Sequence, residues 1–96
     1  MDSLTTAPLA EIIEHRLRAA LQPTRLAVVN DSAKHRGHMG DDGSGESHWT
    51  VEIEAAAFAG QGRVARQRLV NTALADLLAA RIHALAIRAT APGEAA

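Results

Sequence analysis

Residues 48–54 are His48-Trp49-Thr50-Val51-Glu52-Ile53-Glu54, and they alternate between polar and apolar side chains at every position. A period of two is typical of a β-strand with one buried face and one exposed face. The stretch therefore predicts a strand whose Trp49, Val51 and Ile53 point into a core. His48, Thr50 and the two glutamates are expected to point outward. The rest of the fold can be built around this strand.

The chain before this strand predicts a helix, a strand and a long loop. Residues 8–21 repeat apolar side chains at helical spacing, and Pro23 stops the helix. Residues 25–30 are short, apolar and rich in valine, which favours a strand. From 31 to 47 the chain is polar and glycine-rich, with no apolar periodicity, so we expect an exposed loop. Loops of this length in compact domains are often functional.

The chain after the strand predicts one helical turn, a long helix and a last strand. Residues 55–59 suit a single turn that ends at Gly60-Gln61-Gly62. Residues 63–80 form an amphipathic pattern typical of a helix, and residues 82–89 are expected to be a strand. Flexible ends are expected over 1–7 and 91–96, around one domain over 8–90. The element order is then α-β-β-α-α-β.

This order predicts an α+β fold with a three-stranded mixed sheet and helices packed on one face. A helix-containing link between strands 48–54 and 82–89 has the length of a right-handed crossover between parallel strands. Both strands should therefore begin at the same edge of the sheet. The loop over 31–47 ends at that edge, and His83 is expected there as the second residue of the last strand.

Composition limits the function classes. The chain has 96 residues, no cysteine and a formal charge of -1, so it has no disulfide, no thiolate ligand and no overall attraction to polyanions. Its N-terminus lacks the basic and apolar regions of a signal peptide, and no stretch approaches the roughly 18 apolar residues of a membrane span. A cytoplasmic protein without membrane contact is expected. The sequence has no Ser-His-Asp order, no paired carboxylates in a recognisable pocket and no phosphate-binding glycine loop. Nothing in it therefore predicts an enzyme.

Histidines are the main candidates for chemistry. The loop carries His35 and His38, and the topology brings them toward His48 and His83. One interpretation of His83 is a partly buried strand residue that packs against the helices. The other is a metal ligand, since imidazole is a common ligand near neutral pH. A closed site needs about four ligands, so a partner would have to supply the others.

A second candidate site lies at the start of the long helix. Gly60-Gln61-Gly62 is followed by Arg63 and Arg66, one turn apart, where helix N–H groups can hold a phosphate. The alternative is a solvated basic turn after a glycine hinge. The stretch Gly37-His38-Met39-Gly40 matches the G-x-x-G clamp of KH domains, but it lies between two strands rather than two helices, so we take the match as coincidence.

The order and spacing of several short motifs resemble the BolA family over nearly the whole chain. The motifs are Gly45-Glu46-Ser47-His48-Trp49, Phe58-Ala59-Gly60, Arg66-Gln67-Arg68-Leu69-Val70-Asn71 and Ile82-His83-Ala84-Leu85, with Asp31-Ser32-Ala33-Lys34-His35 at the head of the loop. The resemblance implies a fold akin to class II KH domains, in agreement with the order predicted from the residues.

The resemblance also implies a partner and a cofactor. BolA-like proteins pair with monothiol glutaredoxins and share a [2Fe-2S] cluster, for which the partner side supplies thiolates and glutathione. His83 stands at the family's ligand position, and His35 matches the loop ligand. Ala33 replaces a histidine common in the family's loop, so His38 is a rival to His35.

Two further features of the resemblance bear on function. Gln67 and Trp49 replace a histidine and a phenylalanine that are usual in the family, and neither is a proposed ligand. The family is also described as transcriptional, which makes a DNA-binding regulator the alternative, with Arg63, Arg66 and Arg68 as contacts. A protein-interaction module with a structural His83 is the third hypothesis, and a weak homodimer is compatible with each.

Overall fold

The computed structural model describes residues 8–31 and 47–94 and confirms the predicted α+β fold. Its elements follow the predicted order except that the long helix is divided into two. In chain order they are α2 (Leu9–Leu21), β1 (Arg25–Asn30), β2 (His48–Glu54), the short 3-10 helix η2 (Ala56–Phe58), α3 (Arg63–Ala73), α4 (Ala75–Ala80) and β3 (Ala84–Thr90).

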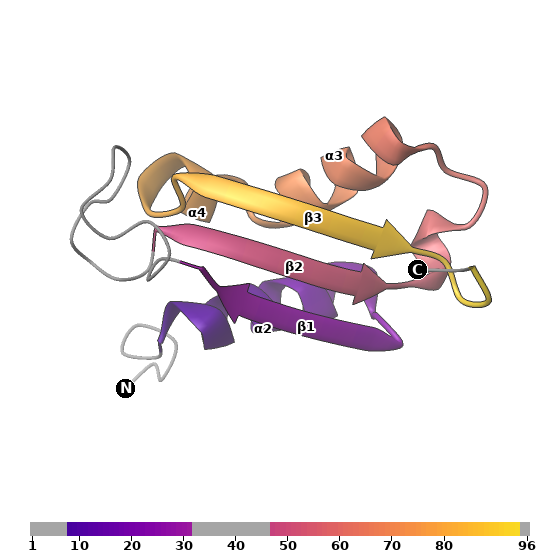
Figure 1. Cartoon of the computed structure of the whole chain (residues 1–96), viewed down its shortest axis with the longest axis horizontal. Coiled ribbons are helices and arrows are strands. Elements are labelled where there is room, and N and C mark those ends of the chain that lie inside the picture. The colour runs from indigo at the N-terminus through magenta and orange to yellow at the C-terminus, as the bar shows by residue number, and fades with distance from the viewer. Residues whose placement is uncertain (1–7, 32–46, 95–96) are drawn as a thin grey trace.

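The three strands form one mixed sheet in the order β1-β2-β3. β1 pairs antiparallel with β2, and β2 pairs parallel with β3, so that Val28, Val51 and Ile87 lie in one row. Among the described residues, the helices cover one face of this sheet and no helix lies on the opposite face (Figure 1). The parallel pairing confirms that β2 and β3 begin at the same edge, as the crossover predicts.

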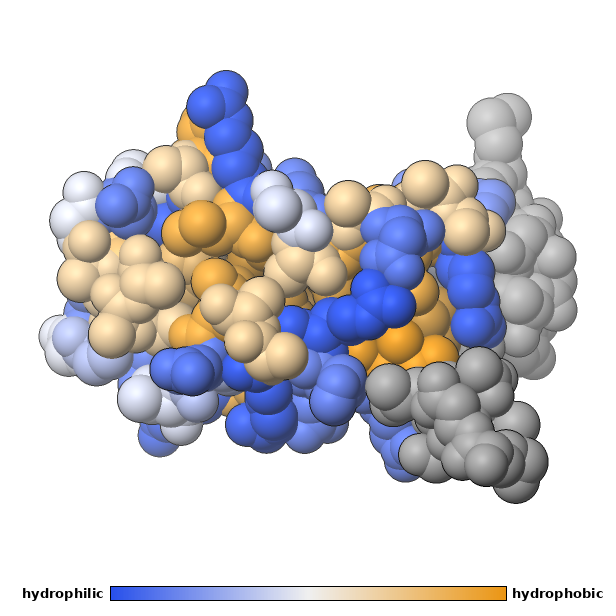
Figure 2. Space-filling model, turned by 180° about the vertical axis from the view of Figure 1, so that it is seen from behind, coloured by the Kyte–Doolittle hydropathy of each residue, from blue (hydrophilic) through white to orange (hydrophobic). Residues whose placement is uncertain are grey.

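The core lies between the sheet and the helices. Trp49, Val51 and Ile53 of β2 are buried as the alternation predicts, and Leu9, Ile13 and Leu17 of α2 are fully buried beside them. Spacing of four residues places these three side chains on one face of the helix. Figure 2 shows the helical side of the molecule, where hydrophobic surface is visible in the hollows between hydrophilic side chains. No helix of the described residues has the length and apolar character needed to cross a membrane.

The predicted helix over 63–80 is wrong in one respect, because the chain leaves helical geometry at Leu74 (φ -113°, ψ 15°). The Leu74 N–H contacts the carbonyls of both Val70 and Asn71, which tightens the turn before α4. Val70, Leu74 and Leu77 are all buried. Their apolar spacing runs through the break unchanged, which is why the pattern predicts a single helix.

The last strand begins later than predicted, at Ala84 instead of Ile82, and ends at Thr90. The Ile82 N–H donates to the Leu77 carbonyl at 2.8 Å, so the backbone at Ile82 is still hydrogen-bonded to α4 and has not entered the strand. After β3, the expected flexible tail instead begins with a packed turn. Ala91 is buried, and the Glu94 N–H donates to the Ala91 carbonyl at 3.1 Å.

Candidate functional site

One end of the sheet brings the two ends of the long loop together with His83. The Asp31 N–H donates to the His48 carbonyl at 2.8 Å, and the His83 N–H donates to the Ser47 carbonyl at the same distance. In Figure 1 the end of β1 and the beginnings of β2 and β3 lie together at this edge. The predicted placement of His83 beside the loop is therefore confirmed for the residues that the structure describes.

His83 lies one residue before β3 and is exposed. The interpretation of His83 as a partly buried strand residue is therefore wrong. It fails because a period-two pattern does not show where a strand begins, and the hydrogen bond to Ser47 holds the His83 backbone just outside the ladder. The result is an exposed imidazole on an anchored backbone.

His48 has a different environment from the one predicted. Its side chain was predicted on the outward face of the strand, but the residue is only 8% exposed and Ser47 is fully buried. The Ser47 Oγ and the His48 Nδ1 are 2.8 Å apart, which satisfies both buried polar groups. Alternation predicts the side of the sheet on which a side chain lies, but not how exposed the side chain is there. His48 thus supports the fold at this edge.

The predicted loop ligands, His35 and His38, lie outside the described residues. Within residues 8–31 and 47–94, no group of three or more histidine, aspartate or glutamate side chains is placed to hold a metal ion. Of the predicted ligands, only His83 is in the described part of the chain. It can be one ligand of a site that other residues complete.

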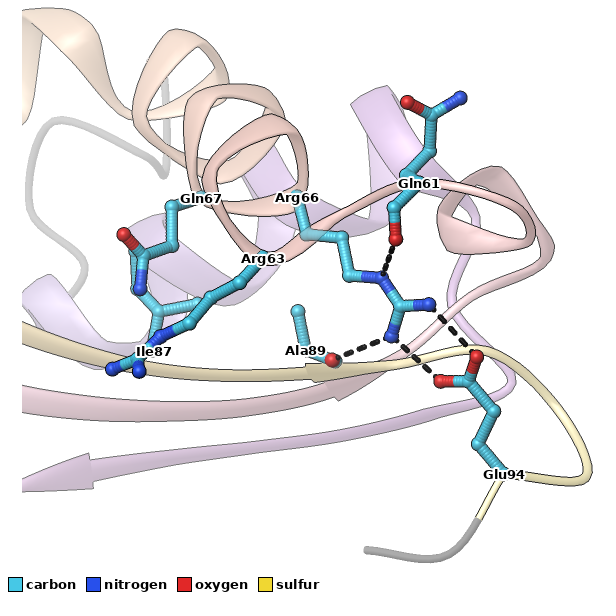
Figure 3. Close-up of a pocket in the computed structure, with 7 residues that line it drawn as sticks. All are labelled: Gln61, Arg63, Arg66, Gln67, Ile87, Ala89 and Glu94. Carbon is cyan, nitrogen blue, oxygen red and sulfur yellow. Dashed lines mark hydrogen bonds and ion pairs between the residues drawn. The ribbon is translucent and has the colours of Figure 1, made fainter.

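The opposite end of β3 carries a second polar cluster, which is centred on Arg66 (Figure 3). Its guanidinium donates to the Gln61 carbonyl at 2.8 Å, to the Ala89 carbonyl at 3.1 Å and to both carboxylate oxygens of Glu94 at 2.6 and 2.8 Å. The Arg66 side chain is only 14% exposed. A bidentate arginine–carboxylate pair is among the stronger polar contacts in proteins.

This pairing changes the titration of Glu94. The Arg66 guanidinium and the N–H of Ala91 stabilise the carboxylate and hold its pKa at about 2, below the usual 4.5. Glu94 in turn raises the pKa of Arg66. Residues 66 and 94 are far apart in the sequence, and no local motif links them, so sequence patterns give no signal for this contact.

The three arginines predicted for nucleic acid do not form one surface. Arg66 is engaged within the chain, whereas Arg63 and Arg68 are exposed on α3. Arg63 lines a cavity of about 300 Å³ between α3 and β3, together with Gln61, Arg66, Gln67, Ile87, Ala89 and Glu94. Arg68 does not line this cavity. The structure therefore separates the predicted basic cluster into one internal and two surface residues.

Comparison with known proteins identifies the family. The family model described as BolA-like protein matches residues 17–94, which include His83 and the Arg66 cluster. The chain belongs to the BolA-like family. An uncharacterized protein in the cobS 5′ region of Sinorhizobium sp. is 52% identical to this BolA-like chain over 87 residues, which cover 90% of the chain and 94% of the relative.

Two further relatives of this BolA-like chain carry informative names. The DNA-binding transcriptional regulator BolA of Vibrio cholerae is 46% identical over 79 residues, which cover 82% of the chain and 71% of the relative. The solved BolA domain of SufE1 from Arabidopsis thaliana is 34% identical and superposes with a TM-score of 0.82, covering 93% of the chain and 98% of the domain. The observed order of helices and strands is thus the BolA-like fold.

Proposed function

We propose that this BolA-like chain is a cytoplasmic binding and assembly factor that holds a bridging [2Fe-2S] cluster together with a monothiol glutaredoxin. In this proposal, His83 is one ligand and His35 of the loop is the second, with His38 as the alternate. The observation that carries it is the position of His83, which is exposed and anchored through its backbone to Ser47 at the end of the loop. The proposal assigns no catalytic role to the chain.

The donor set supports a shared cluster rather than one held by this chain alone. Iron–sulfur clusters are usually held by thiolates, and the chain has no cysteine. Thiolates would therefore come from the glutaredoxin and its glutathione, with imidazoles on this side. Replacement of thiolate by histidine raises the reduction potential of a cluster. The name of the Arabidopsis thaliana relative, a BolA domain within SufE1, is consistent with a role beside other assembly proteins.

Reconstitution of the complex tests this proposal. The chain and a monothiol glutaredoxin would be mixed with iron, sulfide and glutathione, and visible absorbance and circular dichroism recorded. We expect His83→Ala to change the cluster spectrum. Of the two loop variants, His35→Ala and His38→Ala, the one that removes the second ligand should also change it. The matched control His15→Ala, on the exposed side of α2, should leave the spectrum unchanged. A wild-type spectrum from His83→Ala would remove His83 as a ligand.

DNA binding is the second candidate, and two observations favour it. The Vibrio cholerae relative is named a DNA-binding transcriptional regulator, and Arg63 and Arg68 are exposed on α3. Two phosphate contacts predict a slope of about -2 for log affinity against log salt. Fluorescence anisotropy with a labelled duplex would measure this slope, and Arg63→Gln with Arg68→Gln should abolish it. No binding even at low salt would exclude this function.

A further inference from the structure

β3 is an edge strand that pairs with β2 on one side only. The Ala84 N–H donates to the Ser47 carbonyl, just before β2. The Thr90 carbonyl accepts from the Ala55 N–H, just after β2. The N–H of Ala84 and the carbonyl of Thr90 therefore both face β2. Peptide groups of successive strand residues point in alternate directions within the sheet plane. The groups that face away from β2 are therefore those of Leu85, Ile87 and Ala89.

Only one of these three outward positions has a partner of its own. The Ala89 carbonyl accepts a hydrogen bond from Arg66 Nη1 at 3.1 Å. Among the described residues, no side-chain or loop hydrogen bond reaches the peptide groups of Leu85 or Ile87. Unpaired N–H and C=O groups on a strand edge are a template for another strand. The edge of β3 is thus open at its centre and capped near its end.

The cavity of about 300 Å³ between α3 and β3 adjoins this open edge. Ile87 and Ala89 line it from β3, and Arg63 and Gln67 line it from α3 (Figure 3). A strand added beside β3 would point every second side chain toward the helical side of the sheet. The cavity has room for a small number of such side chains, because its volume is at the lower end of that of ligand pockets.

The charge of the cavity indicates what these side chains should be. Glu94 is neutralised by Arg66, with 2.6 Å between Oε1 and Nη1. Arg63 forms no ion pair with any residue in the described parts of the chain. One uncompensated positive charge therefore remains at the wall, beside the amides of Gln61 and Gln67. A carboxylate of a bound ligand would neutralise this charge.

We propose that the edge of β3 binds an extended acidic peptide segment of a partner protein by strand addition. The peptide's backbone pairs with Leu85 and Ile87, and a carboxylate of the peptide contacts Arg63. The Arg66–Glu94 pair marks the end of the added strand, because Arg66 already occupies the Ala89 carbonyl. The added strand would run from Leu85, two residues after His83, to the cavity at Arg63. It uses none of the proposed cluster ligands, so the proposal does not depend on cluster binding.

A peptide titration of the full chain tests this proposal. The probe is the acetylated and amidated peptide SVEVEVS, with SVKVKVS as the charge control, followed by backbone amide shifts and hydrogen exchange in nuclear magnetic resonance. We expect the acidic peptide to bind and to slow exchange at the Leu85 and Ile87 amides. Arg63→Gln should weaken binding about 3- to 10-fold. The matched control Arg68→Gln, which lies outside the cavity, should have no effect.

Several results would overturn the proposal. They are no binding at millimolar peptide, equal binding of the lysine peptide, or binding without slower exchange at Leu85 and Ile87. An equal loss of affinity in Arg68→Gln would show general charge attraction instead of a contact with Arg63. Tighter binding of a single-stranded oligonucleotide at the same amides would assign the edge to nucleic acid, and concentration-dependent shifts without peptide would assign it to a second copy of the chain.

Discussion

Replacement of Phe58 by alanine should remove a large part of the stability of this domain. Phe58 is the only phenylalanine of the chain and one of its two aromatic residues, and it is fully buried at the end of η2. Truncation of a buried phenylalanine to alanine costs about 3–5 kcal/mol, since it loses transfer free energy and leaves a cavity. A domain of this size has a total stability of about 5–14 kcal/mol. Phe58→Ala should therefore lose between about a fifth of this stability and all of it.

Urea unfolding measures this loss, and Trp49 provides the signal. It is the only tryptophan and is 3% exposed, so its fluorescence should report the opening of the core. With a slope of about 1.5 kcal/mol per molar urea, the midpoint should fall by about 2–3 M. The control is Val64→Ala, because Val64 is 60% exposed and should change stability by less than about 0.5 kcal/mol. A loss below about 1 kcal/mol in Phe58→Ala would refute the assignment of Phe58 to the core.

Three further predictions concern single residues. Ser47→Ala should cost about 0.5–1.5 kcal/mol in urea unfolding, because the 2.8 Å hydrogen bond between Ser47 Oγ and the buried His48 imidazole is lost. Gly60→Ala should cost about 1–2 kcal/mol, because Gly60 has φ +74°, whereas Gly62→Ala should change stability by no more than about 0.5 kcal/mol. Glu94→Gln should flatten the acid side of the stability curve, measured by thermal unfolding at a series of pH values. The folded pKa of Glu94 is lowered to about 2 from 4.5, so the Arg66 contact stabilises fully above about pH 4.5 and is lost as the pH falls toward 2.

Each of these predictions has a result that contradicts it. Wild-type stability in Ser47→Ala would mean that the His48 ring has another sufficient partner. Equal effects of the two glycine substitutions would show that backbone conformation at position 60 is not the cause. The control Glu52→Gln should leave the acid side of the stability curve as in the wild type. If Glu94→Gln leaves it unchanged too, the Arg66 pair does not link pH to stability.

The local patterns of the sequence predicted most of the fold. β1 and β2 have the predicted bounds, and α2 differs by one residue at its start. These elements are regular because burial on one face repeats every two or 3.6 residues, and this period is visible in the residues themselves. The parallel pairing of β2 and β3 also followed, since a helix-containing link constrains how two strands can share a sheet.

The ends of elements were less predictable. The break at Leu74 keeps the apolar spacing of a continuous helix, and the true start of β3 depends on hydrogen bonds from Ile82 and His83 to residues earlier in the chain. The spacing of side chains does not encode such contacts. The same limit explains why His83 was placed correctly beside the loop but wrongly inside the strand.

The sequence alone determined which segments form helices and strands, which of their faces are apolar, and that any thiolate ligand must come from another protein. Tertiary structure decided that His48 is buried beside Ser47, that His83 is exposed, and that Arg66 is paired with Glu94. The difference has a physical cause. Periodicity reports the environment of a residue relative to its own element, whereas burial of a polar group and formation of an ion pair depend on distant segments that meet only after folding.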